Sequence, residues 1–194
     1  MSVPTIVMVT GATRGIGRTL VETYLLRPNH TVIGSVRDKD SALAEELQIL
    51  PTGEGSKLLL VKIESTSSTD PAEAVKELQA AGIDHLDIVI ANAGGNGSVG
   101  SLPLDLVSAE EIKQTFNMNA IGPLLLYQAV KPLLFKSSKS PKFVPITTAW
   151  GSIKNLQKSR AHLAPAYGVS KAGLNWLTVY VHKSRHPLTS ISNA

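Results

Sequence analysis

Apolar and polar positions along the chain follow two different periods. Five short stretches rich in Val, Ile and Leu are typical of buried strands: residues 5–10, 30–37, 57–64, 86–94 and 142–148. Between them apolar residues recur every three or four positions, which predicts helices over 15–27, 41–50, 70–81, 108–135 and from about Pro165 onward. Strands that alternate with helices indicate a parallel sheet with crossover helices. We therefore expect an α/β fold, a Rossmann-type doubly wound parallel sheet, with residues 1–194 forming one domain.

Two details of this pattern qualify the expected elements. Gly122 and Pro123 fall inside the helical stretch 108–135, and this pair should kink the helix. Near the end of the chain, LTSIS (188–192) has the composition of a strand, so we expect a sixth strand to begin there.

The predicted strand ends carry the residues most suited to a ligand. In open α/β sheets, ligands bind outside the carboxyl ends of the strands, where the strand order reverses. The first, fourth and fifth strands end in small or polar residues: Thr10-Gly11, Asn92-Ala93-Gly94 and Thr147-Thr148. We expect these three ends to open on one crevice.

A glycine-rich turn, TGATRGIG (10–17), joins the first strand to the first helix. Gly11, Gly15 and Gly17 tolerate unusual dihedral angles, and their missing side chains let a pyrophosphate approach the amides at the helix N-terminus. The alternative is a merely tight turn. Its place at the start of a βαβ unit favours dinucleotide binding.

The choice of dinucleotide depends on the end of the second strand. A 2′-hydroxyl is usually held there by an acidic residue, whereas a 2′-phosphate prefers an arginine. Here Arg37 precedes Asp38, and Arg14 lies in the glycine turn. The two arginines favour NADP(H), with NAD(H) as the alternative because of Asp38.

Tyr167 and Lys171 stand four residues apart in AYGVSKAGLNW (166–176). On a helix this spacing places the phenol and the ammonium on the same face, one turn apart. The pair is therefore a candidate for proton transfer, although the spacing alone also fits an ordinary helix face.

Composition excludes several other classes of function. The chain has 43% apolar and 18% charged residues, as in an ordinary globular protein. It contains no cysteine, and its five histidines are scattered, so we expect no metal site. No apolar stretch reaches the roughly 20 residues that span a bilayer. The formal charge is +4, but the basic residues are not grouped with aromatic residues, so we expect no nucleic-acid partner.

Four motifs, taken in order, resemble those of the short-chain dehydrogenase/reductase family. They are the cofactor turn TGATRGIG, ANAG (91–94), FNMN (116–119) and YGVSK (167–171). Their order is more specific than any one of them. Stretches such as VETYLLRPNHTVIGSVRD are similar to fungal ketoreductases of secondary metabolism, of the norsolorinic acid ketoreductase type.

The resemblance implies a role for each matching residue. Tyr167 would be the general acid, and Lys171 would lower the pKa of Tyr167 and hold the nicotinamide ribose. Asn119 would anchor a water molecule that relays protons to Lys171. The turn and the ANAG motif, together with Arg37 at the end of the second strand, would bind the cofactor through a larger set: Gly11, Thr13, Arg14, Gly15, Ile16, Gly17, Arg37, Asn92, Ala93 and Gly94.

The chain departs from the family pattern in two places. A serine usually donates a hydrogen bond to the substrate carbonyl, but this sequence has Thr148, with Ser152 as the second candidate. Family members also continue beyond the last residues here, so the resemblance implies a fold without its usual C-terminal part, open on the substrate side.

We therefore expect a cytoplasmic NADP(H)-dependent ketoreductase or alcohol dehydrogenase that acts on a small carbonyl or alcohol and forms a homo-oligomer. Two alternatives stay open at this point. One is a cyclase or isomerase on the same fold with Tyr167 as acid or base. The other is a catalytically impaired, truncated form that still binds nucleotide.

Overall fold

The computed structural model describes residues 3–97 and 102–184, and the segment 188–192 lies outside these residues. The chain packs as two units. The first, which we call the sheet unit, comprises residues 1–94 and 122–146. The second, the helical unit, comprises residues 95–121 and 147–194.

The sheet unit contains five parallel strands in the order β3-β2-β1-β4-β5. The strands are β1 (Thr5–Val9), β2 (His30–Val36), β3 (Lys57–Lys62), β4 (Ile88–Ala91) and β5 (Lys142–Pro145). Its helices are α1 (Gly15–Leu25), α2 (Ala42–Gln48), α3 (Asp70–Ala80) and α5 (Gly122–Phe135). The order confirms the expected parallel sheet, and it reverses beside β1, so that β1 and β4 flank the switch point.

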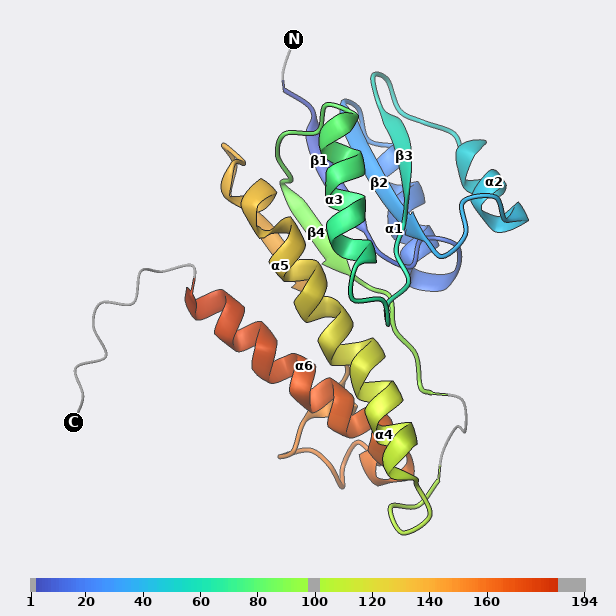
Figure 1. Cartoon of the computed structure of the whole chain (residues 1–194), viewed down its shortest axis with the longest axis vertical. Helices are drawn as coiled ribbons and strands as arrows, with labels where there is room; N and C mark the ends of the chain where they lie inside the picture. The colour runs from blue at the N-terminus through green and yellow to red at the C-terminus, as the bar shows by residue number, and fades with distance from the viewer. Residues whose placement is uncertain (1–2, 98–101, 185–194) are drawn as a thin grey trace, which may run out of the picture. The chain divides into compact units, whose positions relative to one another are not determined.

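Two apolar layers bury the faces of this sheet. Along β1 the side chains alternate, so Ile6 and Met8 enter one layer and Val7 and Val9 enter the other. The first layer includes residues of α3 and α5, and the second includes residues of α1 and α2. Figure 1 shows α3 in front of the strands and α1 behind them. Both faces are covered, as a parallel sheet requires.

The fifth strand is shorter than its sequence predicts. We expect a strand over 142–148, but β5 ends at Pro145, opposite Ala91, the last residue of β4. Proline has no N–H to donate, and the last bond between the two segments runs from the backbone N–H of Ile146 to the carbonyl of Ala91 at 2.9 Å. Thr147 and Thr148 therefore lie beyond the strand, in the helical unit.

The helical unit is built around α6 (Pro165–Ser184), which packs against α4 (Ala109–Phe116). Gly173 permits this contact, because a Cβ atom there would lie 2.6 Å from the ring of Phe116. Two short 3₁₀ helices, η2 (Ala149–Gly151) and η3 (Ala161–Leu163), precede α6.

The long helix expected over 108–135 is interrupted by a π-helical turn, η1 (Asn117–Ile121). We expect the irregularity at Gly122-Pro123, and the structure has it immediately before that pair. Pro123 has no N–H for the carbonyl of Asn119 four residues earlier, so the regular bonding cannot continue. A wider turn relieves this conflict and places Asn119 inside it.

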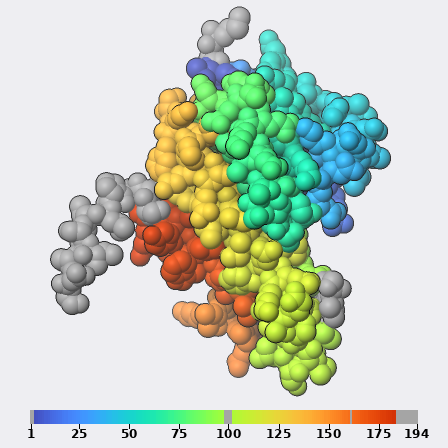
Figure 2. Space-filling view, in the orientation of Figure 1, coloured from blue at the N-terminus to red at the C-terminus, as the bar shows by residue number. Residues whose placement is uncertain are grey.

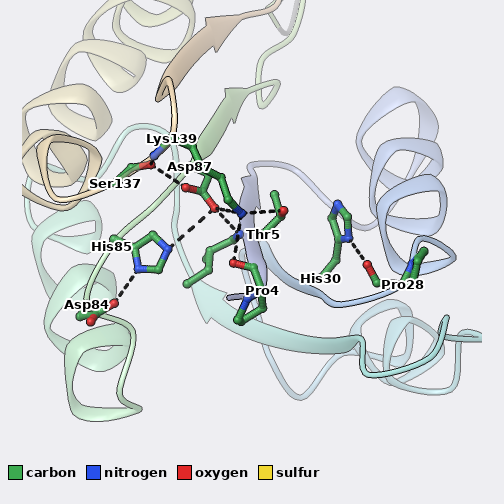
Figure 3. A network of polar contacts seen from close by, with 10 residues as sticks. Pro4, Thr5, Pro28, His30, Asp84, His85, Asp87, Ser137 and Lys139 are labelled. Carbon is green, nitrogen blue, oxygen red and sulfur yellow. Dashed lines mark hydrogen bonds and ion pairs between the residues drawn. The ribbon is translucent and has the colours of Figure 1, made fainter. Parts of the chain in front are cut away.

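A buried carboxylate ties the amino ends of β1 and β4 to the loop before β5 (Figure 3). The carboxylate of Asp87 accepts hydrogen bonds from the backbone N–H of Ile6 at 2.9 Å and the Ser137 hydroxyl at 2.6 Å, and it pairs with Lys139 Nζ at 3.3 Å. Burial opposes ionisation of this carboxyl, but these donors together hold the pKa of Asp87 below its ordinary value.

We expect Asp87→Asn to lower the free energy of unfolding at pH 7 by about 2 kcal/mol, because an amide cannot accept from all these donors. A lowered pKa stabilises the fold above the pKa of the unfolded state, and this contribution disappears as the pH falls through the folded pKa. Urea unfolding at pH 7 and below about pH 4 should therefore show that the difference between wild type and variant shrinks in acid.

The matched control is Asp84→Asn, since Asp84 belongs to the same group of side chains but is exposed and contacts only His85 among them. We expect a smaller effect there. Equal losses for the two variants would show that the Asp87 carboxylate has no special role.

Candidate active site

The glycine turn after β1 is held in a narrow shape by its neighbours in the sheet unit. Gly11 has a φ of +68°, and a Cβ atom on Gly17 would lie 2.1 Å from the carbonyl oxygen of Gly11. Both positions therefore require glycine. Gly15 also has a positive φ, of +56°, but a Cβ atom there would meet nothing within 4 Å. The backbone at Gly15 is open to a ligand.

Among the residues that the structure describes, no side chain accepts a hydrogen bond from the backbone N–H groups at the N-terminus of α1. Arg14 occupies the N-cap position without a side-chain capping bond, and the first turn carries no acidic residue. Ile16 in that turn is 62% exposed. Free N–H groups and the helix dipole make such an end suited to an anion such as a pyrophosphate.

Asn92 couples the end of β4 to this turn. Its side-chain amide donates to the carbonyl of Thr10 at 2.9 Å, and Thr10 Oγ1 accepts from the backbone N–H groups of Asn92 and Ala93 at 3.1 and 3.0 Å. The structure thus brings Gly11, Asn92 and Ala93 together and gives Asn92 a positioning function in the sheet unit.

The end of β2 lies beside the same turn. Gly11 donates its backbone N–H to the Ser35 hydroxyl at 3.3 Å, and Ala12 donates to the Ser35 carbonyl at 3.0 Å. Arg37 and Asp38 follow and are exposed. The Asp38 carboxylate accepts from the backbone N–H of Asp40 at 2.9 Å, so one of its oxygens is already used within its own turn.

Tyr167 and Lys171 lie one turn apart near the start of α6, on the same face. Lys171 Nζ is 5.7 Å from the centre of the Tyr167 ring, and the lysine is only 5% exposed. Burial raises the pKa of Tyr167 and lowers the pKa of Lys171. The shift at Tyr167 is opposite to the lowering that we expect from the resemblance, and removal of the phenol from water is its cause.

Asn119 lies in the π-helical turn and is fully buried. Its side-chain oxygen accepts from the backbone N–H of Gly95 at 3.0 Å, and its nitrogen donates to the Gly95 carbonyl at 2.7 Å and to Ser170 Oγ at 2.9 Å. Both amide hydrogens are therefore committed to the protein. A water molecule held by Asn119 would therefore have to donate a hydrogen bond to the side-chain oxygen or the backbone oxygen of Asn119.

Ser170 is a site residue that the sequence motifs do not single out. It is fully buried, accepts from Asn119 and donates to the backbone carbonyl of Tyr167 at 2.8 Å. Ser170 thus links the π-helical turn to the first turn of α6. The available signal is a serine three residues after the tyrosine and next to the lysine, which places a small polar group on the buried side of the helix.

Thr148 and the short helix η2 sit against this part of α6. A Cβ atom on Gly151 would lie 2.7 Å from the backbone of Lys171, so glycine permits this close approach. The ring of Trp150 meets the Tyr167 ring edge to face, with centroids 6.1 Å apart. Thr148 Oγ1 accepts a 3.4 Å bond from the backbone N–H of Trp150, which orients the hydroxyl.

The neighbouring hydroxyls differ from Thr148 in their surroundings. Thr147 donates to the side chain of Asn175 at 2.6 Å, so its proton is already used. Ser152 ends η2 and has no side-chain bond to another described residue. Among residues 3–97 and 102–184, no cluster of His, Asp or Glu could hold a metal ion, and no helix is long and apolar enough to cross a membrane.

The strand order and the glycine turn after β1 define a nucleotide-binding α/β protein of the Rossmann type. The chain matches the short chain dehydrogenase family over residues 5–188 and belongs to this family of oxidoreductases.

The relatives of the chain include fungal dehydrogenases and ketoreductases. Short-chain dehydrogenase RED3 of Pyricularia oryzae is 48% identical over 98% of this chain and 75% of its own length. Norsolorinic acid ketoreductase nor1 of Dothistroma septosporum is 41% identical over 90% of this chain and 65% of its own length. An NADPH-bound carbonyl reductase from chicken fatty liver has a TM-score of 0.81, 29% identity, and coverage of 94% of this chain and 72% of that one.

We expect Ser170→Ala to lower the free energy of unfolding by about 1–2 kcal/mol, because one amide hydrogen of Asn119 loses its buried acceptor. Urea unfolding of Ser170→Ala, Asn119→Ala and the double variant measures the coupling. The double variant should lose less than the sum of the single losses, since the unpaired amide is then absent. Strict additivity would contradict a direct bond between the two side chains.

Proposed function

We propose that this protein is an NADP(H)-dependent oxidoreductase that interconverts a ketone and a secondary alcohol. One observation carries the proposal: the phenol of Tyr167 and the buried ammonium of Lys171 share one face of α6, 5.7 Å from ring centre to nitrogen. A phenol beside a lysine is suited to exchanging a proton with a carbonyl oxygen.

The sheet unit would bind the dinucleotide. Gly15 leaves open backbone at the start of α1, whose uncapped N–H groups suit the pyrophosphate. Thr13, Arg14 and Ile16 complete the binding turn. Asn92, Ala93 and Gly94 support it from β4, through the bonds between Asn92, Ala93 and Thr10.

Two exposed arginines support NADP(H) as the cofactor. Arg14 and Arg37 make no ion pair within the described parts of the chain, so their charges are available for a 2′-phosphate. Asp38 is the residue that would hold a 2′-hydroxyl, but one of its carboxylate oxygens already accepts a hydrogen bond from the backbone N–H of Asp40. NAD(H) is the alternative cofactor.

The helical unit would supply the proton. Because burial raises the pKa of Tyr167, the neutral phenol is the form present at pH 7, and this is the form that can donate to a carbonyl oxygen. Lys171 would hold the nicotinamide ribose, and Asn119 would position a water molecule that relays protons. When bound, the reduced nicotinamide supplies the hydride. These roles favour the reductive direction.

Thr148 would donate a hydrogen bond to the substrate carbonyl. The bond from Trp150 orients its oxygen, and no acceptor among the described residues takes its proton. Thr147 is engaged with Asn175, so Thr148 is the better candidate. The names of the relatives, a carbonyl reductase and a norsolorinic acid ketoreductase, support a carbonyl compound as substrate and a role in secondary metabolism.

We expect Tyr167→Phe to lower kcat for ketone reduction by roughly a hundredfold or more, because the ring stays and only the acidic hydroxyl is lost. Loss of NADPH absorbance with a ketone measures turnover. Tyr180→Phe is the matched control, since Tyr180 lies on the same helix and is 57% exposed. Undiminished turnover in Tyr167→Phe would exclude Tyr167 as the acid.

We expect Arg37→Gln to reduce kcat/KM for NADPH by roughly tenfold to a hundredfold and to change the value for NADH much less, because only NADPH carries the 2′-phosphate. Steady-state rates with each cofactor give the comparison. Arg27→Gln serves as the control, since Arg27 lies over the ring of Tyr24 at 4.7 Å. Equal losses for both cofactors in Arg37→Gln would show that Arg37 does not recognise this phosphate.

A further inference from the structure

Charge is distributed very unevenly along this chain. All fifteen Asp and Glu residues precede residue 112. Residues 1–111 contain eight Lys and Arg, whereas residues 112–194 contain eleven and no acidic residue. The two parts therefore carry formal charges of −7 and +11, which add to the +4 of the whole chain. Such asymmetry indicates a ligand of opposite charge for the basic part.

Several basic residues of the sheet unit have partners within that unit. Lys139 pairs with Asp87, Lys131 lies 5.7 Å from the centre of the Phe135 ring, and Lys136 acts electrostatically on Asp84. In the helical unit, Lys154, Lys158 and Arg160 are exposed, and none of them makes an ion pair with any residue that the structure describes. Ion pairing with the described residues therefore does not account for these three charges.

The three cations lie on one short segment, residues 152–163, which we call the basic loop. Successive turns keep it compact: Asn155 donates to the carbonyl of Ser152 at 3.2 Å, and Ser159 donates to that of Asn155 at 2.8 Å. The second bond closes one full helical turn. Lys158 lies within this turn, and Lys154 directly precedes it.

Both ends of the basic loop are fixed beside the candidate acid. The residue before it, Gly151, packs against the backbone of Lys171, and the ring of Trp150 contacts that of Tyr167. After it, Ala164 is 2% exposed and accepts the backbone N–H of Gly168 at 2.9 Å. The loop therefore begins and ends at residues that pack against the first turns of α6, where Tyr167 lies.

The basic loop also exposes apolar side chains. Ile153 is 84% exposed, Leu156 44% and Leu163 46%. In Figure 2 the orange atoms of this part of the chain lie at the surface. Cations interspersed with exposed aliphatic groups suit a molecule that combines a negative group with an apolar body.

We propose that the basic loop determines substrate choice by binding an anionic group, such as a carboxylate, on an otherwise apolar ketone. Lys154, Lys158 and Arg160 contact this group while its carbonyl lies at Tyr167. A role in substrate choice rests on the proposed reductase function, whereas the binding of an anion beside Tyr167 does not.

The test compares 4-oxo-4-phenylbutanoate with its methyl ester, two ketones that differ in charge. In the triple variant Lys154→Gln, Lys158→Gln, Arg160→Gln, we expect kcat/KM for the carboxylate to fall about tenfold relative to that for the ester, and raised salt to reduce the wild-type preference. Circular dichroism checks the fold, and Lys158→Gln alone gives a smaller change of the same sign.

The matched control removes the same charge elsewhere. Lys57, Lys76 and Lys142 are exposed in the sheet unit and make no ion pair with the residues described there, so changing all three to Gln should leave the carboxylate-to-ester ratio unchanged. An equal fall in both triple variants would show that only net charge matters and would overturn the proposal.

Binding gives a readout that does not need turnover. The chain has two tryptophans, so Trp176→Phe leaves Trp150, next to the basic loop, as the single fluorescent reporter. The carboxylate should quench Trp150 at lower concentration than the ester, and the basic-loop substitutions should remove this difference.

The outcomes separate the two proposals. Selective carboxylate binding without NADPH oxidation would contradict the reductase function and retain the basic loop as an anion site. Reduction of both ketones with equal kcat/KM, unaffected by the basic-loop substitutions, would contradict anion recognition by the basic loop and would be consistent with the reductase function. The proposal for the basic loop would also be overturned if the wild type bound phosphatidylserine vesicles in a salt-sensitive way, and the basic-loop substitutions removed this binding but left the carboxylate-to-ester ratio unchanged.

Discussion

The buried amide of Asn119 is the interaction on which the helical unit depends. It joins three segments that are distant in sequence: the loop at Gly95, the π-helical turn and the start of α6 through Ser170. A buried amide with unpaired hydrogens would be costly, so these bonds define one arrangement of the three segments. The position of Tyr167 follows from it, because Ser170 also binds the carbonyl of that residue.

Burial determines the direction of the pKa shifts of both Tyr167 and Lys171. The ammonium would favour an ionised phenol, yet the removal of water raises the pKa of Tyr167 and lowers that of Lys171. The pKa of Asp87 shifts the other way for an acid: its carboxyl is buried too, but three hydrogen-bond donors outweigh the cost of desolvation. Hydrogen bonds to the carboxylate, rather than burial by itself, therefore separate a structural charge from a reactive group.

Much of the sheet unit follows from the sequence, since buried parallel strands leave long apolar runs and the glycines at 11 and 17 mark positions where no side chain fits. The pairing of Tyr167 with Lys171 follows from helical spacing alone. The π-helical turn does not, because Gly122-Pro123 marks a break without fixing its length or side. Ser170 could not be predicted from the sequence for a related reason. Its role depends on a hydrogen bond from Asn119, fifty-one residues away, and no local sequence pattern indicates that contact.

The π-helical turn also constrains how this chain can change. Such a turn amounts to one extra residue within an α-helix, so loss of a residue between Asn117 and Ile121 would remove that extra residue, while Pro123 would still leave one carbonyl of the preceding turn without an N–H partner. Each later side chain of the helix would then be rotated by about 100° relative to those before it. Substitutions in this stretch alter one contact at a time, whereas a single deletion would reassign every inward and outward position beyond it. The length of this segment should therefore vary less between lineages than its composition.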